Sequence, residues 1–473
     1  MTSQYKNPVK AFGSWLASVS RDWPEPAVIS AHREFIDVVA VMVPGAVEPV
    51  TRNVFETIKL WGANSGSCTA VGHSSTMAAP WAALVNGTAG HALDFDDNFD
   101  PPKAHATTVL APAILALGEQ EGASGMDCLD AYIVGLQILG RVGQGVNPTH
   151  RNRGWHATAT VGAIGAAAAC ARLLKLDPEK AAYAVSIATS MAAGFMSQFG
   201  TMTKPLHAGL AAKSGIMAAS FAQHGIDAGM GVLDSGTGMN RLMVGPDYEQ
   251  LRDAITNPEH GQVLRFETDH VGEPLLITEH GFRVKRFPNC GSAHRAMDGV
   301  LAIREEQNLT VDDVARVDIH APSVHLNNLM YHDPKTGLQG KFSMEYALAL
   351  ALLYGDARLS DFTDGQVNRA EIRAVYPILH LHPVDKLEGE FPTEVKVTLK
   401  DGRSFEKVIA MPLGSGPAPF PTSQYWTKFE GCVDGILPGD TTAALRSTLE
   451  DLPALKNISD LMRHMVWPLS AAA

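Results

Sequence analysis

The stretch TATVGAIGAAAACARLL, residues 158–174, contains the longest apolar run of the chain, which covers residues 161–174. Alanine and glycine dominate this run, and Arg172 interrupts it. It is too short to span a bilayer, which takes about 20 apolar residues. Small side chains let neighbouring helices approach closely, so we expect a helix buried among other helices.

The same helical pattern extends over most of the first 260 residues. Apolar residues recur there at helical spacing, whereas the alternation typical of strands is almost absent. Asp177 and Pro178 suit the N-cap and the first turn of one such helix. The expected helices cover residues 26–42, 78–93, 107–121, 127–143, 158–174 and 178–193.

The pattern changes after about residue 262. Short apolar runs at 262–266 and 274–277 are bounded by turn signals, and residues alternate with period two in VARVDIH (314–320) and TEVKVTL (393–399), which predicts strands. Asp401-Gly402 predicts a tight turn before a third strand at 405–411. Helices are expected at about 291–307 and 341–354.

We therefore predict a mainly α protein with a large all-helical domain and a smaller α+β lid domain. Residues 1–264 form the helical domain, which a helical C-terminal part, 412–473, completes, and residues 265–411 form the lid. The Gly- and Pro-rich stretch 412–421 is the expected linker out of the lid.

Length and composition agree with this architecture. The 473 residues are too many for one ordinary domain. The net charge of −12 and the lack of a basic run argue against nucleic-acid or anionic-membrane binding. Five scattered cysteines without a CxxC motif argue against a zinc ribbon or a disulfide scaffold. With no signal-peptide pattern at the N-terminus, we expect a cytoplasmic globular protein.

The densest polar cluster is HALDFDDNFDPPKAH, residues 91–105. It allows three interpretations: a solvated loop between helices, a metal site, or an active-site loop. A calcium loop of the EF-hand type is disfavoured because the central Gly and the terminal Glu are missing. In an active-site loop, Asp94 and His105 would carry protons or anchor substrate.

Other candidate residues precede helices. His156 lies before the small-residue helix, where the helix dipole disfavours imidazolium and an anion could bind. Lys204, followed by Pro205, would sit at a helix N-terminus as a carboxylate anchor. A cation cluster that includes Lys285 and Arg286 would form a local anion site. The alternatives are a structural histidine and a solvated basic patch.

Common cofactor and nucleophile motifs are missing. The chain has no GxxxxGK[ST], GxSxG or HExxH, and the glycines of residues 140–145 follow a helical pattern rather than a strand. Nothing in the sequence lowers the pKa of the Cys290 thiol. The residues alone therefore favour proton chemistry beside a carboxylate of a small polycarboxylate, without a metal or an organic cofactor.

Five motifs in order resemble those of the MmgE/PrpD family, from about residue 10 to about residue 430. They are HALDFDDNFDPPKAH, GWHATATVGAIGAAAA, GTMTKPLHAGLAA, VKRFPNCGSAH and KFSMEY. That family includes 2-methylcitrate dehydratase, cis-aconitate decarboxylase and iminodisuccinate epimerase. The resemblance implies a helical domain with an α+β lid, a homodimer formed through the helical domains, and an active site between the domains without a cofactor.

The resemblance also implies the site residues. Lysines would pair with substrate carboxylates, histidines would exchange the proton, the tyrosine would be a second acid, and Asp94 would orient a histidine. The implied catalytic residues are Asp94, His105, His156, Lys204, Lys285 and Tyr346. The implied substrate-binding residues are Asn98, Lys103, His207, Arg286 and Cys290.

Among the activities of the family, we expect first the dehydration of a 2-methylcitrate-like hydroxy acid. Asn98 stands where decarboxylating relatives tend to carry a hydroxyl residue, and the loop is one residue longer at 101–103. The epimerase-like relative lacks the tyrosine that this chain keeps as Tyr346. Epimerisation, decarboxylation and a non-catalytic binding role remain the alternatives.

Overall fold

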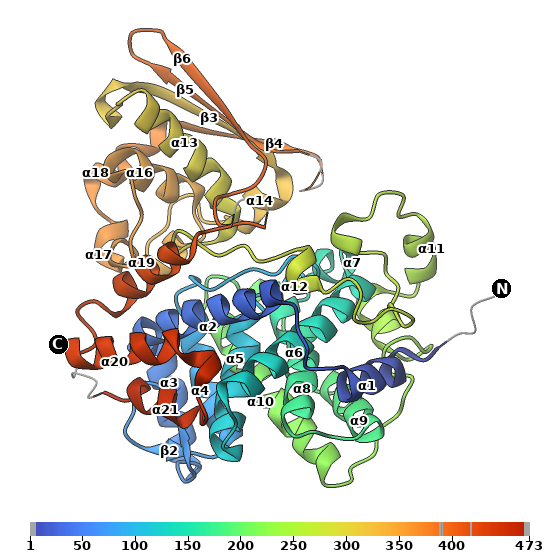
Figure 1. Ribbon diagram of the computed structural model, residues 1–473. Helices are drawn as coiled ribbons and strands as arrows, with labels where there is room; N and C mark the ends of the chain where they lie inside the picture. Colours follow the sequence, from blue (N-terminus) through green and yellow to red (C-terminus); the bar gives the residue numbers. More distant parts are fainter. Residues whose placement is uncertain (1–5, 387–388, 390, 417–418, 468–473) are drawn as a thin grey trace. The chain divides into compact units, whose positions relative to one another are not determined.

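The computed structural model describes residues 6–386, 389, 391–416 and 419–467, and the chain divides into two compact units. The first unit comprises the chain up to Ala92, Asp96–Phe282 and the C-terminal part from Pro421. The second comprises Leu93–Phe95 and Arg283–Phe420. The mainly α architecture with a small sheet in one unit confirms the predicted fold class (Figure 1).

The first unit is helical. Among the described residues, its strands form one hairpin of two short strands, each two residues long. The hairpin, β1 (Cys68–Thr69) and β2 (Thr76–Met77), was not predicted. The helices are α1 (Pro8–Ser18), α2 (Glu25–Ala46), α3 (Pro49–Leu60), α4 (Ala79–His91), α5 (Thr107–Glu121), α6 (Gly125–Val146), α7 (Thr149–Asn152), α8 (Ala157–Leu173), α9 (Pro178–Thr189), α10 (Thr203–Gln223), α11 (Tyr248–Asp253), α12 (Leu276–Glu279), α19 (Thr422–Val433), α20 (Gly439–Glu450) and α21 (Ser459–Met462).

Helix α8 is the buried small-residue helix that the sequence predicts. Every residue of the helix except Arg172 is buried, as expected for a helix that is apolar on all sides. Arg172 leaves the apolar interior toward Asp130, to which its Nε and Nη2 donate hydrogen bonds of 2.7 and 3.1 Å. The interruption in the apolar run is therefore a buried ion pair between α8 and α6.

Helices α4 and α10 touch through backbone. A Cβ atom at Gly87 would lie 2.9 Å from Gly209 Cα, and a Cβ at Gly209 would lie 2.2 Å from Leu84 O. Glycine is therefore required at this crossing. The close approach places the C-terminal end of α4, which leads into the polar loop, and the N-terminal part of α10, which carries Lys204 and His207, in one region.

Helix α6 borders the polar loop at residues 91–105. The glycines of residues 140–145 lie inside this helix, which agrees with the helical pattern and not with a dinucleotide-binding loop. A Cβ at Gly143 would lie 2.3 Å from Pro102 Cα. The glycine thus lets the loop pack directly on the helix.

The first unit extends beyond the predicted boundary at residue 264, as far as Phe282. Polar side chains of α6 bind the carbonyl groups of the segment 270–274, which follows the short apolar run. Arg141 donates to the carbonyls of His270, Val271, Glu273 and Pro274, and Gln137 donates to those of Val271 and Pro274. These bonds attach a segment without strands to the helical unit, so the change of pattern at 262 does not mark the boundary.

The second unit contains a four-stranded sheet in the order β4-β3-β5-β6. Strand β4 (Leu379–Val384) pairs parallel with β3 (Val314–Pro322), while β5 (Thr393–Leu399) pairs antiparallel with β3 and with β6 (Ser404–Ile409). Strand β4 was not predicted. Its sequence, LHLHPV, contains two histidines and a proline that an edge strand tolerates.

Helices cover one face of this sheet, where α13 packs on β5 and β6 and against α16 (Figure 1). Valines and isoleucines of the strands point into this layer, and they alternate with polar residues on the other face. The helices of the unit are α13 (His294–Glu306), α14 (Ser323–Asn328), α15 (Gly337–Gly340), α16 (Met344–Tyr354), α17 (Asp364–Val367) and α18 (Ala370–Arg373). The expected linker at 412–421 includes residues 417–418, which lie outside the described residues.

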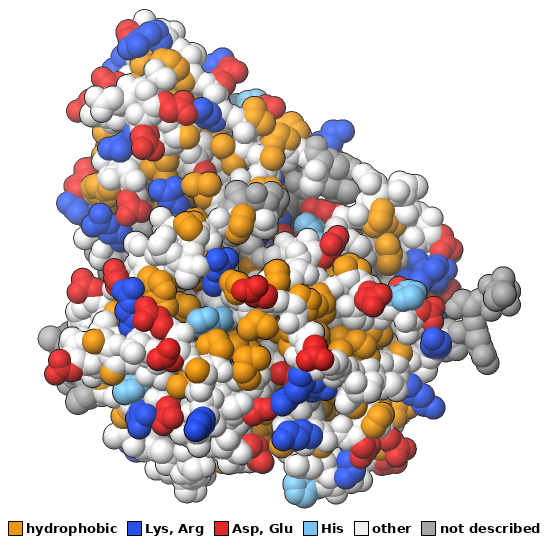
Figure 2. Space-filling model, viewed as in Figure 1, with side chains coloured by type: hydrophobic (Ala, Val, Ile, Leu, Met, Phe, Trp, Pro, Cys, Tyr) orange, Lys and Arg blue, Asp and Glu red, His pale blue; other side chains and the backbone are white. Residues whose placement is uncertain are grey.

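The surface agrees with the charge pattern of the sequence. Figure 2 shows acidic and basic side chains intermixed over the face in view. All five cysteines are free, and four of them are buried. Among the described residues, no helix combines the length and the apolar character that crossing a membrane would require.

Candidate active site

Four histidines of the first unit come together, each from a different helix end or loop. His91 is the last residue of α4, and His105 lies two residues before α5. His156 is the N-cap residue of α8, and His207 lies in the first turns of α10. Neighbouring ring centroids are 4.5 Å apart for His91 and His105, 6.1 Å for His91 and His156, and 5.3 Å for His156 and His207. We call this set the histidine row.

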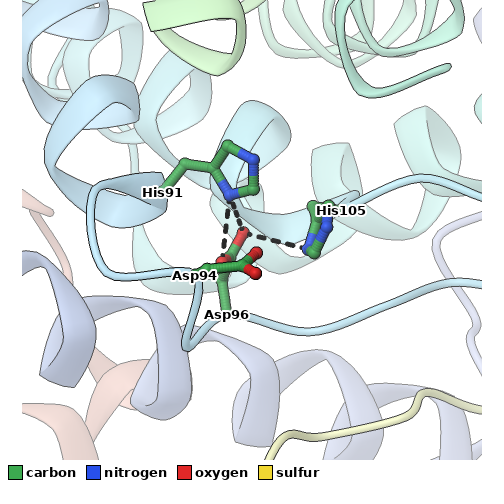
Figure 3. A group of neighbouring side chains, drawn as sticks. All are labelled: His91, Asp94, Asp96 and His105. Carbon is green, nitrogen blue, oxygen red and sulfur yellow. Dashed lines mark hydrogen bonds and ion pairs between the residues drawn. The ribbon is translucent and has the colours of Figure 1, made fainter. Parts of the chain in front are cut away.

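Asp96 lies beside two members of the histidine row (Figure 3). His91 Nδ1 is 2.8 and 3.0 Å from its two carboxylate oxygens, and His105 Nδ1 is 3.4 Å from Oδ2. The side chains of His91 and Asp96 are fully buried, and that of His105 is 12% exposed. One buried carboxylate thus serves two imidazoles, of which that of His105 is partly exposed.

The backbone fixes the tautomer of His105. Its Nδ1 lies 2.7 Å from the carbonyl oxygen of Asp97, which can only accept a hydrogen bond, so Nδ1 carries the hydrogen. The backbone N–H of His105 donates to Thr158 Oγ1 at the start of α8. In the neutral ring, Nε2 is therefore the nitrogen that can accept a proton.

His156 and His207 share one hydrogen. Their Nδ1 atoms are 3.1 Å apart, and one nitrogen must donate while the other accepts. Burial, followed by the charges of His91 and Lys204, lowers the pKa of His156 well below its usual value and that of His207 to about 4. Both rings are therefore neutral at pH 7.

Lys204 provides a buried cation at this end of the row. It is the second residue of α10, as the Lys-Pro pair predicts, and its Nζ lies 5.1 Å from the centroid of the Phe199 ring. The same ring packs edge-on against His156 at 5.0 Å. A lysine that is 4% exposed next to neutral histidines suits the binding of a carboxylate.

The spacing of His91, Asp96 and His105 also meets the requirements of a metal site, because their ligand atoms lie within 4.8 Å of one another. Nδ1 of His105 carries a hydrogen, and Nδ1 of His91 faces a carboxylate that accepts one when ionised. A metal ligand must offer a lone pair, which in each of these neutral rings lies on Nε2. The hydrogen bonds at Nδ1 therefore leave Nε2 of both rings able to bind a metal ion or to accept a proton.

A second group of predicted residues lies in the second unit. Lys285 Nζ donates to the Asp94 carbonyl at 2.6 Å and pairs with Asp94 Oδ1 at 2.9 Å, and both side chains are buried. Lys341 Nζ donates to the carbonyls of Leu93 and Pro288 at 2.5 and 2.7 Å. These contacts explain why Leu93–Phe95 groups with the second unit. In the first unit Asp96 contacts two histidines, and the histidine-orienting role expected of Asp94 stays a prediction.

Tyr346, on α16, is fully buried, and its hydroxyl donates to the carbonyl of Asp361. Burial raises the pKa of this phenol. To act as an acid toward a substrate, the hydroxyl would first have to leave this carbonyl. The group therefore has a structural partner that the motif did not indicate.

The predicted substrate-binding residues have different surroundings. Lys103 Nζ lies 3.8 Å from Asp100 Oδ1 and 3.8 Å from Glu259 Oε1, and its φ is +56°. Asn98 is half-buried in the same loop. Arg286 is exposed, 3.5 Å from Asp298, and Cys290 is half-buried.

Three residues of these groups were not predicted as site residues: His91, Asp96 and Lys341. His91 and Asp96 belong to the polar cluster that the sequence singles out, and Lys341 opens the KFSMEY motif. The available signal was their residue type within a marked motif. Spacing could not distinguish Asp96 from Asp94, because a loop has no fixed period.

Comparisons with known proteins agree with the motifs. The MmgE/PrpD N-terminal domain matches residues 10–251, and the MmgE/PrpD C-terminal domain matches residues 287–452. Cis-aconitate decarboxylases from Mus musculus and Homo sapiens are each 28% identical to the chain, over 93% of it and over 89% and 90% of their own length. One from Aspergillus terreus is 25% identical over 86% of the chain and 85% of its own length. The chain therefore belongs to the MmgE/PrpD family.

Proposed function

We propose that this protein is a lyase that acts on a small polycarboxylate and removes CO2 from an unsaturated acid of the cis-aconitate type. The relatives named above support decarboxylation, one of the alternatives, over the dehydration that we expected first. The observation that carries the proposal in the structure is the histidine row, with a buried lysine beside it.

The chemistry of decarboxylation divides between these groups. When the C–C bond to the leaving carboxylate breaks, CO2 departs and its electron pair stays on the remaining carbon skeleton. Lys204 would pair with a retained carboxylate and stabilise the developing negative charge. A histidine would then donate the proton that forms the new C–H bond. We assign this donor role to His105 in its protonated form, which would give up the hydrogen on Nε2 and keep the one on Nδ1, because a carbonyl holds Nδ1–H.

Dehydration remains the second candidate, and Asn98 is the observation that favours it. This residue stands where decarboxylating relatives tend to carry a hydroxyl. In that reaction one histidine would remove the proton next to a carboxylate, and another acid would protonate the leaving hydroxyl. The contributions of Asp94, Lys285, Tyr346, Arg286, Cys290 and Lys103 remain predictions for either reaction.

We also propose that the protein acts as a homodimer, as the family resemblance implies. Exposed apolar residues on the helical unit support this proposal, notably Leu210 and Phe221 of α10 and Trp61 after α3. Light scattering coupled to size-exclusion chromatography tests it, since a monomer at micromolar concentration would contradict the proposal.

The activity is tested with purified protein, cis-aconitate and 2-methylcitrate in deuterated water. We expect CO2 release from cis-aconitate and a five-carbon unsaturated diacid with one deuterium on carbon, observed by NMR. Formation of an alkene from 2-methylcitrate without CO2 release would favour dehydration instead. If neither substrate reacts and no carbon-bound hydrogen exchanges, the proposed lyase activity is contradicted.

A further inference from the structure

We propose that Asp96 and His91 are positioning residues for His105, with His91 holding the Asp96 carboxylate and that carboxylate serving as counter-ion to the His105 ring. Only the kinetic test of this inference depends on the proposed function. Neither residue is among those that the family motifs imply for this site.

The first step is the pair of His91 and Asp96. Both carboxylate oxygens of Asp96 lie within 3.0 Å of His91 Nδ1, and neither side chain is exposed. A carboxylate buried without water needs hydrogen-bond donors to remain ionised. His91 supplies one such donor from the rigid end of α4, so the position of Asp96 is set by a helix rather than by the loop alone.

The second step is the contact with His105. Its Nδ1 donates to the Asp97 carbonyl and lies 3.4 Å from Asp96 Oδ2. The carbonyl fixes the tautomer, and the carboxylate adds a negative charge close to the ring. When His105 takes a proton on Nε2, Asp96 is a counter-ion 3.4 Å from its Nδ1, and it offsets part of the cost of a buried cation.

The third step concerns the other side of His91. Its Nε2 is buried and has no hydrogen-bond partner among the residues that the structure describes. The ring therefore makes its polar contact through Nδ1, which is the contact with Asp96. A histidine kept only for apolar packing would not need this orientation, so the geometry points to the carboxylate as the reason for a histidine here.

Other charged groups also face these rings and must be considered in any pH measurement. From α8 and α10 they are His156, His207 and Lys204, and from the loop they are Asp96 and Asp97. The positive charge of Lys204 opposes protonation of His105, whereas His156 and His207 are neutral at pH 7. Asp96 acts in the opposite direction, so its removal should shift a pH limb toward lower pH.

The test begins with Asp96→Asn. The amide keeps the size of the side chain but removes the charge. We expect kcat to fall about tenfold or more, the pH limb of kcat to move down by about one unit, and KM to change less than threefold. Asp130→Asn is the matched control, since it makes the same chemical change at a buried carboxylate of this unit that pairs with Arg21 and Arg172 and not with the histidine row. It should keep the wild-type pH profile.

Two variants of His91 test the hydrogen bond separately. His91→Asn retains a donor near the position of Nδ1, and we expect kcat within about threefold of wild type. His91→Leu removes the donor, and we expect it to lower kcat as Asp96→Asn does. Equal loss of activity in both His91 variants, with the pH limb unmoved, would mean that the ring only fills space and would overturn the proposal.

A measurement independent of activity uses 15N-labelled histidine. Among the 18 histidines, the ring signals of His91 and His105, assigned by substitution, should show hydrogen on Nδ1 rather than on Nε2. In Asp96→Asn, the His91 signal should change, and the His105 signal should keep its tautomer but titrate at lower pH. Unchanged titration of both rings would overturn the proposal even if the protein proves inactive on every acid tried.

Discussion

The ion pair between α19 and α2 leads to a prediction that the structure makes in some detail. Lys428 Nζ lies 2.7 Å from Asp37 Oδ1, and the two side chains are 9% and 2% exposed. The change Lys428→Met keeps the length of the side chain but removes its charge. Asp37 then remains buried with Glu34 nearby, whose own carboxyl pKa is raised by burial, by Asp97 and by Asp37.

The size of the effect follows from this geometry. Two unit charges at 2.7 Å attract by about 6 kcal/mol at an effective dielectric constant of about 20. Part of this energy offsets the cost of desolvating the lysine, and removal of one partner of a buried pair typically costs about 3–5 kcal/mol. We expect Lys428→Met to lower the free energy of unfolding by this amount at pH 8. The loss should be smaller at pH 5, where Asp37 without its partner can take up a proton.

The assay is urea unfolding followed by circular dichroism at pH 5 and pH 8. The double variant Asp37→Asn/Lys428→Met should be more stable than Lys428→Met alone, because it leaves no buried charge. Lys180→Met, at a partly buried lysine that donates to a carbonyl, is the matched control and should cost about 1 kcal/mol. A loss below about 1 kcal/mol for Lys428→Met, or a loss that is the same at both pH values, would contradict the reasoning.

Four further changes have defined outcomes. His156→Ala should abolish CO2 release from cis-aconitate while the circular dichroism spectrum stays unchanged, and an unaltered rate of CO2 release would remove His156 from the proposed site. Lys204→Met should raise KM at least tenfold for a tricarboxylate, measured by initial rates, because it removes a cation proposed to pair with a carboxylate. Folding lowers the pKa of His207 to about 4, so this residue makes stability fall as the pH drops from about 6.5 toward 4; His207→Asn should reduce that slope in thermal melts across this range. A chelator should leave activity intact, and inactivation reversed by added zinc would show a metal.

The sequence predicts the helices of the first unit well, because packing and periodicity agree there. The helix expected at 107–121 begins and ends where α5 does, and α8 differs from its expected range by one residue at each end. In both helices almost every residue is buried, so the apolar pattern is strong. Strand β4 was missed because it lies at the edge of the sheet, where a strand tolerates histidines and a proline and therefore need not show a clear apolar alternation.

Long-range contacts account for what the sequence could not predict. The sequence pattern changes before the segment 265–282 and therefore assigns it to the lid. In the structure, Arg141 and Gln137 bind its carbonyl groups and keep it with the helical unit. For the site, the motifs predicted His105, His156, His207 and Lys204, which the fold brings together through three separate helices. The contact between Asp96 and His105 could not be predicted, since only the folded loop shows that this carboxylate faces the ring.

The contact between Gly143 and Pro102 constrains how this enzyme can change. With only 2.3 Å between a hypothetical Cβ of residue 143 and Pro102 Cα, the helix leaves the loop no room for even one added methyl group. An extra residue in the loop, such as the one expected at 101–103, must therefore be accommodated by loop residues that do not contact Gly143. A change of loop length, in evolution or by engineering, is thus limited to the part of the loop that does not pack on α6.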